Sequence, residues 1–310
     1  MDSSLAIVFP GQGSQSVGML AELATEHSQV VDTFEQASDV LGYDLWQLVQ
    51  DGPADELNET DKTQPAMLAA GVAVWRLWQA GDGAQPALMA GHSLGEYTAL
   101  VCAGALDYQD AVSLVAERGR CMQSAVPAGS GAMAALLGLD DAAVQAVCEQ
   151  AAEGEVVSAV NFNSPGQVVI AGKTAAVQRA MALAKESGAK RAVQLPVSVP
   201  SHCALMQPAA EAFAKHLDEA TITRPSIRVM QNVDALLHDD PVRIRENLNK
   251  QLFSPVQWVR SVQAMSDQGV TRIIEAGPGK VLTGLCKRID RSITAAAVFD
   301  QASLVAALQA

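Results

Sequence analysis

A serine between two glycines stands in the segment GHSLGEYTAL. The spacing Gly91-His92-Ser93-Leu94-Gly95 fits a nucleophile elbow, in which a strand turns sharply into a helix and presents the serine hydroxyl. Small flanking residues let the backbone make this turn without clashes. Apolar PALMAG, of strand length, precedes the motif, and the alanine-rich EYTALVCAGAL after it suits a buried helix. These flanks favour a serine that attacks acyl groups over a serine at an ordinary tight turn.

A serine nucleophile needs a nearby base, because its hydroxyl is poorly nucleophilic at neutral pH. Histidine is the usual choice, since its unperturbed pKa of about 6.5 leaves it mostly neutral and still basic. His202, in PVSVPSHCALM, follows a predicted strand and precedes a predicted helix, a position where loops present catalytic side chains. A purely structural role is the alternative for His202. His92 adjoins Ser93 and is predicted to point away from it as an elbow residue.

The other histidines and the neighbouring cysteine are weaker candidates. His27, His216 and His238 stand in polar stretches and are predicted to lie at the surface. Cys203 follows His202 directly, but no base is suggested for it as a second nucleophile. Because the histidines show no HExxH or similar spacing, no metal site is expected.

One arginine stands on the apolar face of a predicted helix. Positions Ala111, Leu114, Val115, Arg118 and Met122 follow the i, i+3, i+4, i+7 spacing of a single buried face. Taking a guanidinium out of water costs several kcal/mol unless a carboxylate meets it, and arginine holds a carboxylate by paired bonds. The partner of Arg118 is either an internal acid or a substrate. The second interpretation predicts a site for an acyl group that carries a free carboxylate.

The loop FPGQGSQ follows the first predicted strand and is predicted to open a helix, so its backbone amides are placed to bind a developing oxyanion. Its glycines do not meet GxGxxG, and no Walker lysine follows. Phosphate binding of those kinds is therefore excluded. Gln12 as an oxyanion donor, together with the backbone N–H of Leu94, suits an acyl-transfer site.

Composition excludes several classes of protein. The chain has 310 residues and a net charge of -13 at pH 7, which argues against nucleic acid as the main partner. No apolar run reaches the ~18 residues of a membrane span, and the first residues lack the basic region of a secretion signal. We therefore expect a cytoplasmic protein without a membrane partner. The five cysteines, without a CxxC pair, are expected to be reduced. A local basic patch remains in GKVLTGLCKRIDR, at Lys280, Lys287, Arg288 and Arg291.

The fold class predicted from the chain is α/β. Strand LAIVF and the following alternation of strands and helices indicate a mostly parallel sheet with helices on its faces. The helices expected in this part cover residues 15–24, 28–41, 64–80, 95–103 and 108–125. After a stretch rich in proline, glycine and serine, AVPAGSGAM, the pattern becomes βαββαβ, with a hairpin turn at NSPG.

This βαββαβ order is typical of ferredoxin-like domains. We therefore predict a small inserted subdomain at residues 127–198 and a larger core formed by residues 1–126 and 199–310. Strand TRIIEA, turn GPG and helix KVLTGLCKRI would help to complete the larger sheet.

Seven motifs together resemble one family. They are VFPGQGSQ, GHSLGEYTALVCAGAL, VAERGR, VNFNSPGQVVIAG, PVSVPSHCALM, NKQLFSPVQW and EAGPGKVL. They closely resemble the bacterial malonyl-CoA:acyl-carrier-protein transacylases, the loading enzymes of type II fatty acid synthesis. The resemblance spans nearly the whole chain and is more specific than GxSxG alone. Members of the family have a large α/β-hydrolase-like core and a small ferredoxin-like subdomain.

The resemblance implies a role for each matching position. Ser93 would be the acylated nucleophile, and His202 would be its base and acid. Arg118 would hold the malonyl carboxylate. Gln12 and the amide of Leu94 would form the oxyanion hole.

Three supporting positions also follow from the resemblance. Family members orient the histidine by a backbone carbonyl instead of an acid, and the matching position here is Gln251. Asn163 and Ser201 would contribute to the site. The principal positions show no departure from the family pattern.

The implied reaction has two halves and needs neither a metal nor a redox cofactor. Ser93 takes the malonyl group from malonyl-CoA, and the phosphopantetheine thiol of acyl carrier protein then takes it from Ser93. The carrier is usually acidic and would dock on a local basic patch. A monomer is expected.

Three alternatives remain at this stage. An acyltransferase of a polyketide pathway would use the same chemistry. A thioesterase or esterase of the same fold would release the acid to water, although Arg118 would then have no obvious purpose unless the substrate were a diacid. A carrier-protein binding module would carry Ser93 and His202 as relics.

Overall fold

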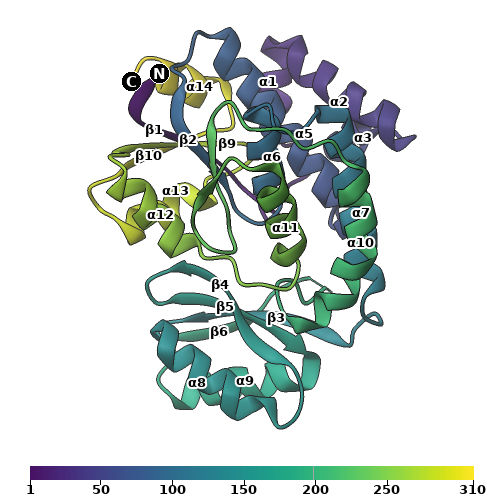
Figure 1. Cartoon of the computed structure of the whole chain (residues 1–310), viewed down its shortest axis with the longest axis vertical. Coiled ribbons are helices and arrows are strands. Elements are labelled where there is room, and N and C mark those ends of the chain that lie inside the picture. The colour runs from purple at the N-terminus through teal and green to yellow at the C-terminus, as the bar shows by residue number, and fades with distance from the viewer. Residues whose placement is uncertain (198) are drawn as a thin grey trace.

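The computed structural model describes residues 1–197 and 199–310, which form two lobes (Figure 1). A six-stranded sheet lies in the larger lobe and a four-stranded sheet in the smaller one. Both termini belong to the larger lobe (Figure 1). This arrangement has the mixed α/β class predicted from the sequence.

The larger sheet has the strand order β10-β9-β1-β2-β7-β8. All neighbours in it pair in parallel except β7 and β8, which are antiparallel. Its strands are β1 (Asp2–Phe9), β2 (Pro86–Gly91), β7 (Arg228–Met230), β8 (Leu237–His238), β9 (Arg272–Ala276) and β10 (Thr294–Val298).

Helices cover both faces of this sheet. Alternate residues of β1 point to opposite sides, and because both sets are apolar, each face must be buried. Leu5, Ile7 and Phe9 belong to one hydrophobic core, whereas Ala6 and Val8 belong to another. The first core is packed mainly by α1 (Ala21–Glu26), α2 (Ser28–Leu41), α3 (Leu45–Asp51), α4 (Ala54–Leu57), α5 (Thr60–Ala80), α6 (Gly95–Cys102), α7 (Tyr108–Ser124), α10 (Gln207–Glu219), α11 (Pro241–Gln251) and α14 (Gln301–Leu308). The second is packed by α12 (Trp258–Asp267) and α13 (Val281–Ile289). A short 3-10 helix, Ala204–Met206, precedes α10.

The smaller lobe has a core of its own beneath an antiparallel sheet of order β4-β5-β3-β6. Its elements follow one another as β3 (Gly131–Leu137), α8 (Asp141–Ala152), β4 (Val157–Ser164), β5 (Gln167–Lys173), α9 (Thr174–Glu186) and β6 (Arg191–Gln194). This is the predicted ferredoxin-like order, with both helices on one face (Figure 1). These elements lie inside the predicted range 127–198, whose last residue, Ser198, is outside the described residues.

Backbone hydrogen bonds join the two lobes. Val256, between α11 and α12, donates its N–H to the carbonyl of Val160 over 2.8 Å and accepts from the N–H of Phe162 over 3.1 Å. The short bridge extends the outer edge of β4. Because the smaller lobe is fixed to the segment that follows α11, its residues can line a site built mainly by the larger lobe.

Most predicted elements match the structure, and one does not. The strand Pro86–Gly91 and the helix Ser28–Leu41 have the expected bounds. The helix predicted at 15–24 is wrong, because the chain makes turns there and α1 begins only at Ala21. Gly18 and Leu20 have φ angles of 81° and 61°, which a right-handed helix does not allow. Helix α5 starts at Thr60, because its polar first turn lies ahead of the apolar run that predicted it.

In the part of the chain that the structure describes, no helix combines the length and apolar character needed to cross a membrane.

Candidate active site

Ser93 lies at a sharp turn between β2 and α6. Its φ angle is 53°, in the left-handed region that L-residues other than glycine rarely adopt. Gly91 and Gly95 permit the turn: a Cβ on Gly95 would lie 2.1 Å from the carbonyl oxygen of Phe9, and one on Gly91 would lie 1.8 Å from the backbone of Gly95. The strand, turn and helix predicted for this segment are therefore all present.

Ser93 and His202 meet although they are 109 positions apart in the chain. The Ser93 Oγ hydroxyl and His202 Nε2 are 2.8 Å apart. His202 Nδ1 lies 2.7 Å from the backbone carbonyl oxygen of Gln251. A carbonyl oxygen only accepts, so Nδ1 carries the ring proton and Nε2 is free to accept the serine proton. The imidazole therefore has the orientation and tautomer of a general base.

The surroundings of His202 keep its ring neutral. The residue is buried, and burial lowers the pKa of His202 to about 3, with the positive charge of Arg118 as the second cause. The hydrogen bond to the backbone carbonyl of Gln251 acts in the opposite direction. Near pH 7 the free protein therefore has an unprotonated Nε2 beside Ser93.

Arg118 is buried on α7, on the face that its spacing predicted. Its Nη1 donates to Gln64 Oε1 over 2.8 Å, and its Nη2 donates to Gln251 Oε1 over 2.9 Å. Its guanidinium carbon lies 5.4 Å from the centre of the Tyr97 ring, within cation–π range. All of these partners are neutral.

No carboxylate pairs with Arg118 among residues 1–197 and 199–310. Its Nε also has no acceptor in this set. The internal ion pair considered as an alternative is therefore not observed there. A buried guanidinium that no carboxylate contacts directly is costly, and an incoming carboxylate would offset that cost.

Gln12 and Leu94, the residues predicted to form the oxyanion hole, lie together. Gln12, in the loop after β1, and Leu94, which follows Ser93, line the same cavity as the Ser93 hydroxyl. The loop lies directly against the elbow, because a Cβ on Gly11 would be 2.3 Å from the carbonyl oxygen of His92 and 3.7 Å from Leu94 N. Within the described residues, neither N–H has a hydrogen-bond acceptor.

Of the remaining predicted residues, Ser201 lines this cavity, whereas Asn163 contacts His92 next to it. His92 donates from Nε2 to Asn163 Oδ1 over 2.8 Å and packs against the ring of Trp258. His92 is among the residues that line the cavity, and within the described residues no hydrogen bond joins its ring to Ser93. This contact holds the His92 ring from the smaller lobe. Ser201 lines the cavity, and its hydroxyl donates to the carbonyl of Val199 over a long 3.5 Å.

The cavity has a volume of about 90 Å³ and lies between the lobes. Apolar side chains complete the lining, among them Met122 from α7 and Met133 from β3. By the same measure one water needs roughly 10–15 Å³, so the space suits a short acyl group and not a long chain.

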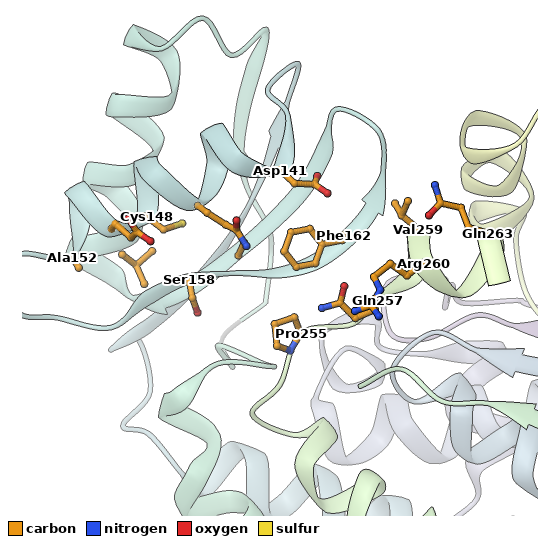
Figure 2. Close-up of a pocket in the computed structure, with 14 residues that line it drawn as sticks. Asp141, Cys148, Ala152, Ser158, Phe162, Pro255, Gln257, Val259, Arg260 and Gln263 are labelled. Carbon is orange, nitrogen blue, oxygen red and sulfur yellow. The ribbon is translucent and has the colours of Figure 1, made fainter. Parts of the chain in front are cut away.

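A larger hollow of about 830 Å³ lies elsewhere between the lobes (Figure 2). It is bounded by α8 and β4 on one side and by the segment from Pro255 to Gln263 on the other, with Phe162 between them (Figure 2). Its lining has no histidine to activate a nucleophile, and burial raises the pKa of its Cys148 thiol to about 12. Despite its size, this hollow lacks the groups that acyl transfer needs.

Sequence reasoning missed three polar residues behind the site. Gln64 holds Arg118, as described above. Asn232 accepts the Ser93 N–H over 2.7 Å and donates to the Gly91 carbonyl over 2.7 Å, so it fixes the elbow. Glu96 accepts from the N–H of Asn232. A signal existed for both Asn232 and Glu96. Asn232 is the second residue after a parallel strand, where functional side chains collect, and Glu96 is the one acid of its largely apolar helix.

The other histidines lie away from Ser93. His27 contacts Gln301, His238 contacts Asp234, and each is partly exposed. His216 lies 3.9 Å from Glu117 and is also partly exposed. The described residues contain no cluster of three or more potential metal ligands.

An α/β fold with an elbow serine, its histidine and two free N–H groups defines a class of acyl-transferring proteins. The chain belongs to the acyl transferase domain family, whose model matches residues 6–309. It is 59% identical to a malonyl CoA-acyl carrier protein transacylase of Salmonella typhimurium, over 99% of both chains.

Solved structures agree with this assignment. The chain is similar to an acyl carrier protein S-malonyltransferase from Vibrio cholerae, with 61% identity, a TM-score of 0.95 and coverage of 98% of this chain and 99% of the other. It is also similar to a malonyl-transacylase solved in complex with its type II PKS acyl-carrier protein, with 56% identity, a TM-score of 0.98 and coverage of 99% of both chains. The family resemblance predicted from the motifs is therefore confirmed.

Proposed function

We propose that the chain transfers a malonyl group from malonyl-CoA to the phosphopantetheine thiol of acyl carrier protein, for fatty acid synthesis. The observation that carries the proposal is the Ser93–His202 pair in one small cavity with Arg118, a buried cation without a carboxylate partner among the described residues. The serine and histidine supply acyl transfer, and the guanidinium selects an acyl group that ends in a carboxylate.

In the first half-reaction, His202 Nε2 takes the Ser93 proton as Oγ attacks the thioester carbonyl of malonyl-CoA. The N–H groups of Gln12 and Leu94 stabilise the negative oxygen of the tetrahedral intermediate. When the intermediate collapses, the C–S bond breaks and the imidazolium returns its proton to the sulfur of CoA. The products are free CoA and a malonyl ester on Ser93.

In the second half-reaction, the carrier's thiol gives its proton to His202 as its sulfur attacks the ester carbonyl. The same N–H groups stabilise the second tetrahedral intermediate. The bond to Ser93 Oγ then breaks, and His202 returns the proton to that oxygen. The free serine is restored and the malonyl thioester leaves on the carrier.

The proposal includes partners and setting. Acyl carrier protein is the acceptor, and support comes from the similar malonyl-transacylase solved with its own carrier. We propose that the reaction uses no metal or bound cofactor, because serine, imidazole and backbone N–H groups account for each step. We also propose a cytoplasmic monomer without nucleic-acid or membrane partners, and sedimentation of the purified chain tests the monomer.

Intact-mass measurement after incubation with malonyl-CoA tests the proposed chemistry. The expected result is a malonyl adduct that is lost in Ser93→Ala and is discharged by added holo acyl carrier protein. A thioesterase would accumulate little adduct and release malonate, and a binding module would form none. Either result would overturn the proposal. Comparing a fatty-acid carrier with a type II polyketide carrier as acceptor distinguishes the two pathways.

A further inference from the structure

Glu96 is a fully buried acid that none of the proposed chemical steps uses. It lies in the first turn of α6, three residues after Ser93, and its exposed fraction is 0%. Its Oε2 accepts two hydrogen bonds, from the N–H of Asn232 over 2.9 Å and from Gln251 Nε2 over 2.9 Å. Burying a carboxylate is costly, so its presence behind the site calls for a specific role.

The Gln251 side chain connects Glu96 to the substrate-binding arginine. Its Oε1 accepts from Arg118 Nη2 over 2.9 Å. Its Nε2 donates to Glu96 Oε2 and, over 3.1 Å, to the backbone carbonyl of Ser93. All three contacts therefore favour the same orientation of the Gln251 amide, with Oε1 toward Arg118 and Nε2 toward Glu96.

The reversed amide would be unfavourable on every side. Its NH₂ group would face the Arg118 guanidinium, donor against donor. Its oxygen would face the Glu96 carboxylate and the Ser93 carbonyl, acceptor against acceptor. Of the three neighbours, ionised Glu96 should contribute most to the free-energy difference between the two amide orientations, since hydrogen bonds to charged groups are stronger than those to neutral groups.

We propose that Glu96 is a positioning residue for the malonyl carboxylate: it fixes the Gln251 amide with its oxygen toward Arg118, and so holds the guanidinium in the geometry that receives the substrate. This inference rests on the proposed function. The carbonyl that orients His202 belongs to the Gln251 backbone at the end of α11, and is held by the helix independently of the amide. The proposed effect of Glu96 is therefore on binding of the acyl group more than on the chemical step.

The charges around Glu96 fit this role. Arg118 and Glu96 attract each other, which favours the charged form of both, whereas Asp234 opposes ionisation of Glu96. Burial is the largest influence and raises the pKa of Glu96 to about 7. Protonation at Oε1, which has no partner among the described residues, leaves Oε2 able to accept from Gln251. The amide orientation therefore persists on both sides of that pKa.

Glu96 also contacts the elbow through Asn232, so the test must separate a purely structural role from positioning. A double-mutant cycle does this, because residues that act through one contact have non-additive effects. The variants are Glu96→Ala, Gln251→Met and the double variant. Ser93 acylation by malonyl-CoA and by acetyl-CoA is followed by rapid-quench intact mass, which gives the half-saturating concentration and the maximal acylation rate of each acyl donor, here called the KM and kcat of this half-reaction.

Glu96→Ala should raise the KM for malonyl-CoA by about 10-fold, as loss of one charge-assisted hydrogen bond implies, and lower kcat much less. Acylation by acetyl-CoA, which has no carboxylate to bind, should fall less than acylation by malonyl-CoA. In the Gln251→Met background the same change should add less than about twofold. Glu96→Gln keeps an acceptor oxygen and should recover most of the malonyl preference.

Three results would overturn the inference. They are equal losses with both acyl donors, full additivity with Gln251→Met, and no recovery in Glu96→Gln. If Glu96→Ala does not fold, Glu96→Gln and Gln251→Met still decide, because the preference must survive in the first and fall in the second. An unmodified chain that forms no malonyl adduct would overturn the proposed function as well, which is a distinguishable outcome.

Glu275 provides a matched control. It is also fully buried and accepts two hydrogen bonds, from the backbone N–H groups of Leu282 and Thr283 over 3.0 and 2.7 Å. These contacts cap the start of α13 and do not involve the site. Glu275→Gln should lower thermal stability while leaving the ratio of malonyl to acetyl acylation unchanged.

Discussion

Arg118 remains without a carboxylate partner in the described part of the chain, although it is almost completely buried. Neutral acceptors on Gln64 and Gln251 fix its direction but do not neutralise its charge. Such a site favours binding of an anion, because the guanidinium has already lost its water in the folded protein and its desolvation adds no further cost on binding. At the scale of single residues, we therefore predict that Arg118 selects an acyl group that carries a negative charge, because no carboxylate of the described residues contacts it.

Replacing Arg118 by alanine should lower the preference for malonyl-CoA over acetyl-CoA by about 10² or more, as loss of a contact of about 3 kcal/mol or more implies. The ratio of the two second-order acylation rates measures it. Arg76→Ala is the control: Arg76 also donates to neutral groups, on Thr33 and Gln36, and lies over the Tyr108 ring. An unmodified protein that used both acyl donors equally would contradict the assignment of Arg118.

The same substitution should change the titration of His202. Burial is the main cause that lowers the pKa of this imidazole to about 3, and the charge of Arg118 is the second. Removing that charge should raise the pKa of His202, so protonation begins at a higher pH in Arg118→Ala. NMR titration of the ring nitrogens measures the change. An unchanged or lower pKa in the variant would contradict the inferred effect of the Arg118 charge on His202.

At the scale of elements, β1, β2 and α6 meet so closely that only glycine fits between them. Gly95 begins α6 against the carbonyl oxygens of Phe9 and Pro10, at 2.1 and 3.0 Å from an ideal Cβ. The helix therefore starts directly behind the strand ends, and Ser93 is forced into its left-handed conformation. The elbow depends on this contact as much as on the serine itself.

Gly95→Ala should push α6 away from β1 and lower the free energy of unfolding by about 1–3 kcal/mol. It should also slow Ser93 acylation more than 10-fold, since small misplacements of reacting groups strongly reduce the rate. Denaturant titration and rapid-quench mass measure the two effects. Gly284→Ala in α13 is the matched control, because its Cβ would meet only the end of Arg288, at 4.0 Å. Alanine there should be neutral or stabilising. Full activity in Gly95→Ala would refute the close-contact argument.

At the scale of the whole molecule, the site is shared between the lobes. The larger lobe supplies the nucleophile, its base and the arginine, while β3 and β4 of the smaller lobe contribute Met133 and Asn161 to the cavity lining. The bridge between Val256 and β4 holds these parts in register. We therefore expect the fixed arrangement of the lobes to keep the cavity small, which would favour a short acyl group.

Val256→Pro removes the buried N–H that donates to Val160, and should lower stability by about 1–3 kcal/mol. Hydrogen exchange in β4 should become faster, and the KM for malonyl-CoA should rise. Arg288→Ala is the control: it removes another cross-lobe bond, to Gln167, but an exposed one, so it should cost less than about 1 kcal/mol. Unchanged exchange in Val256→Pro would indicate that the lobes are held elsewhere.

The sequence by itself determined the local features: the elbow motif, the βαββαβ order of elements in the smaller lobe, the buried face of α7 and the loop that carries Gln12. Each of these depends on periodicity or turn chemistry within a short segment, which can be read without knowledge of distant contacts. The motifs also identified the family, which in turn pointed to Gln251 as the source of the carbonyl near His202.

Only the tertiary structure decided which partners these residues meet. The hydrogen bonds of Arg118 to Gln64 and Gln251 span 54 and 133 positions, and no local pattern predicts them. The same holds for the contacts of Asn232 at the elbow and of Glu96 with Gln251. The helix expected at 15–24 does not form as predicted, because Leu20 has a positive φ angle. The physical reason is that buried polar groups must find partners, and the fold brings those partners from distant parts of the chain.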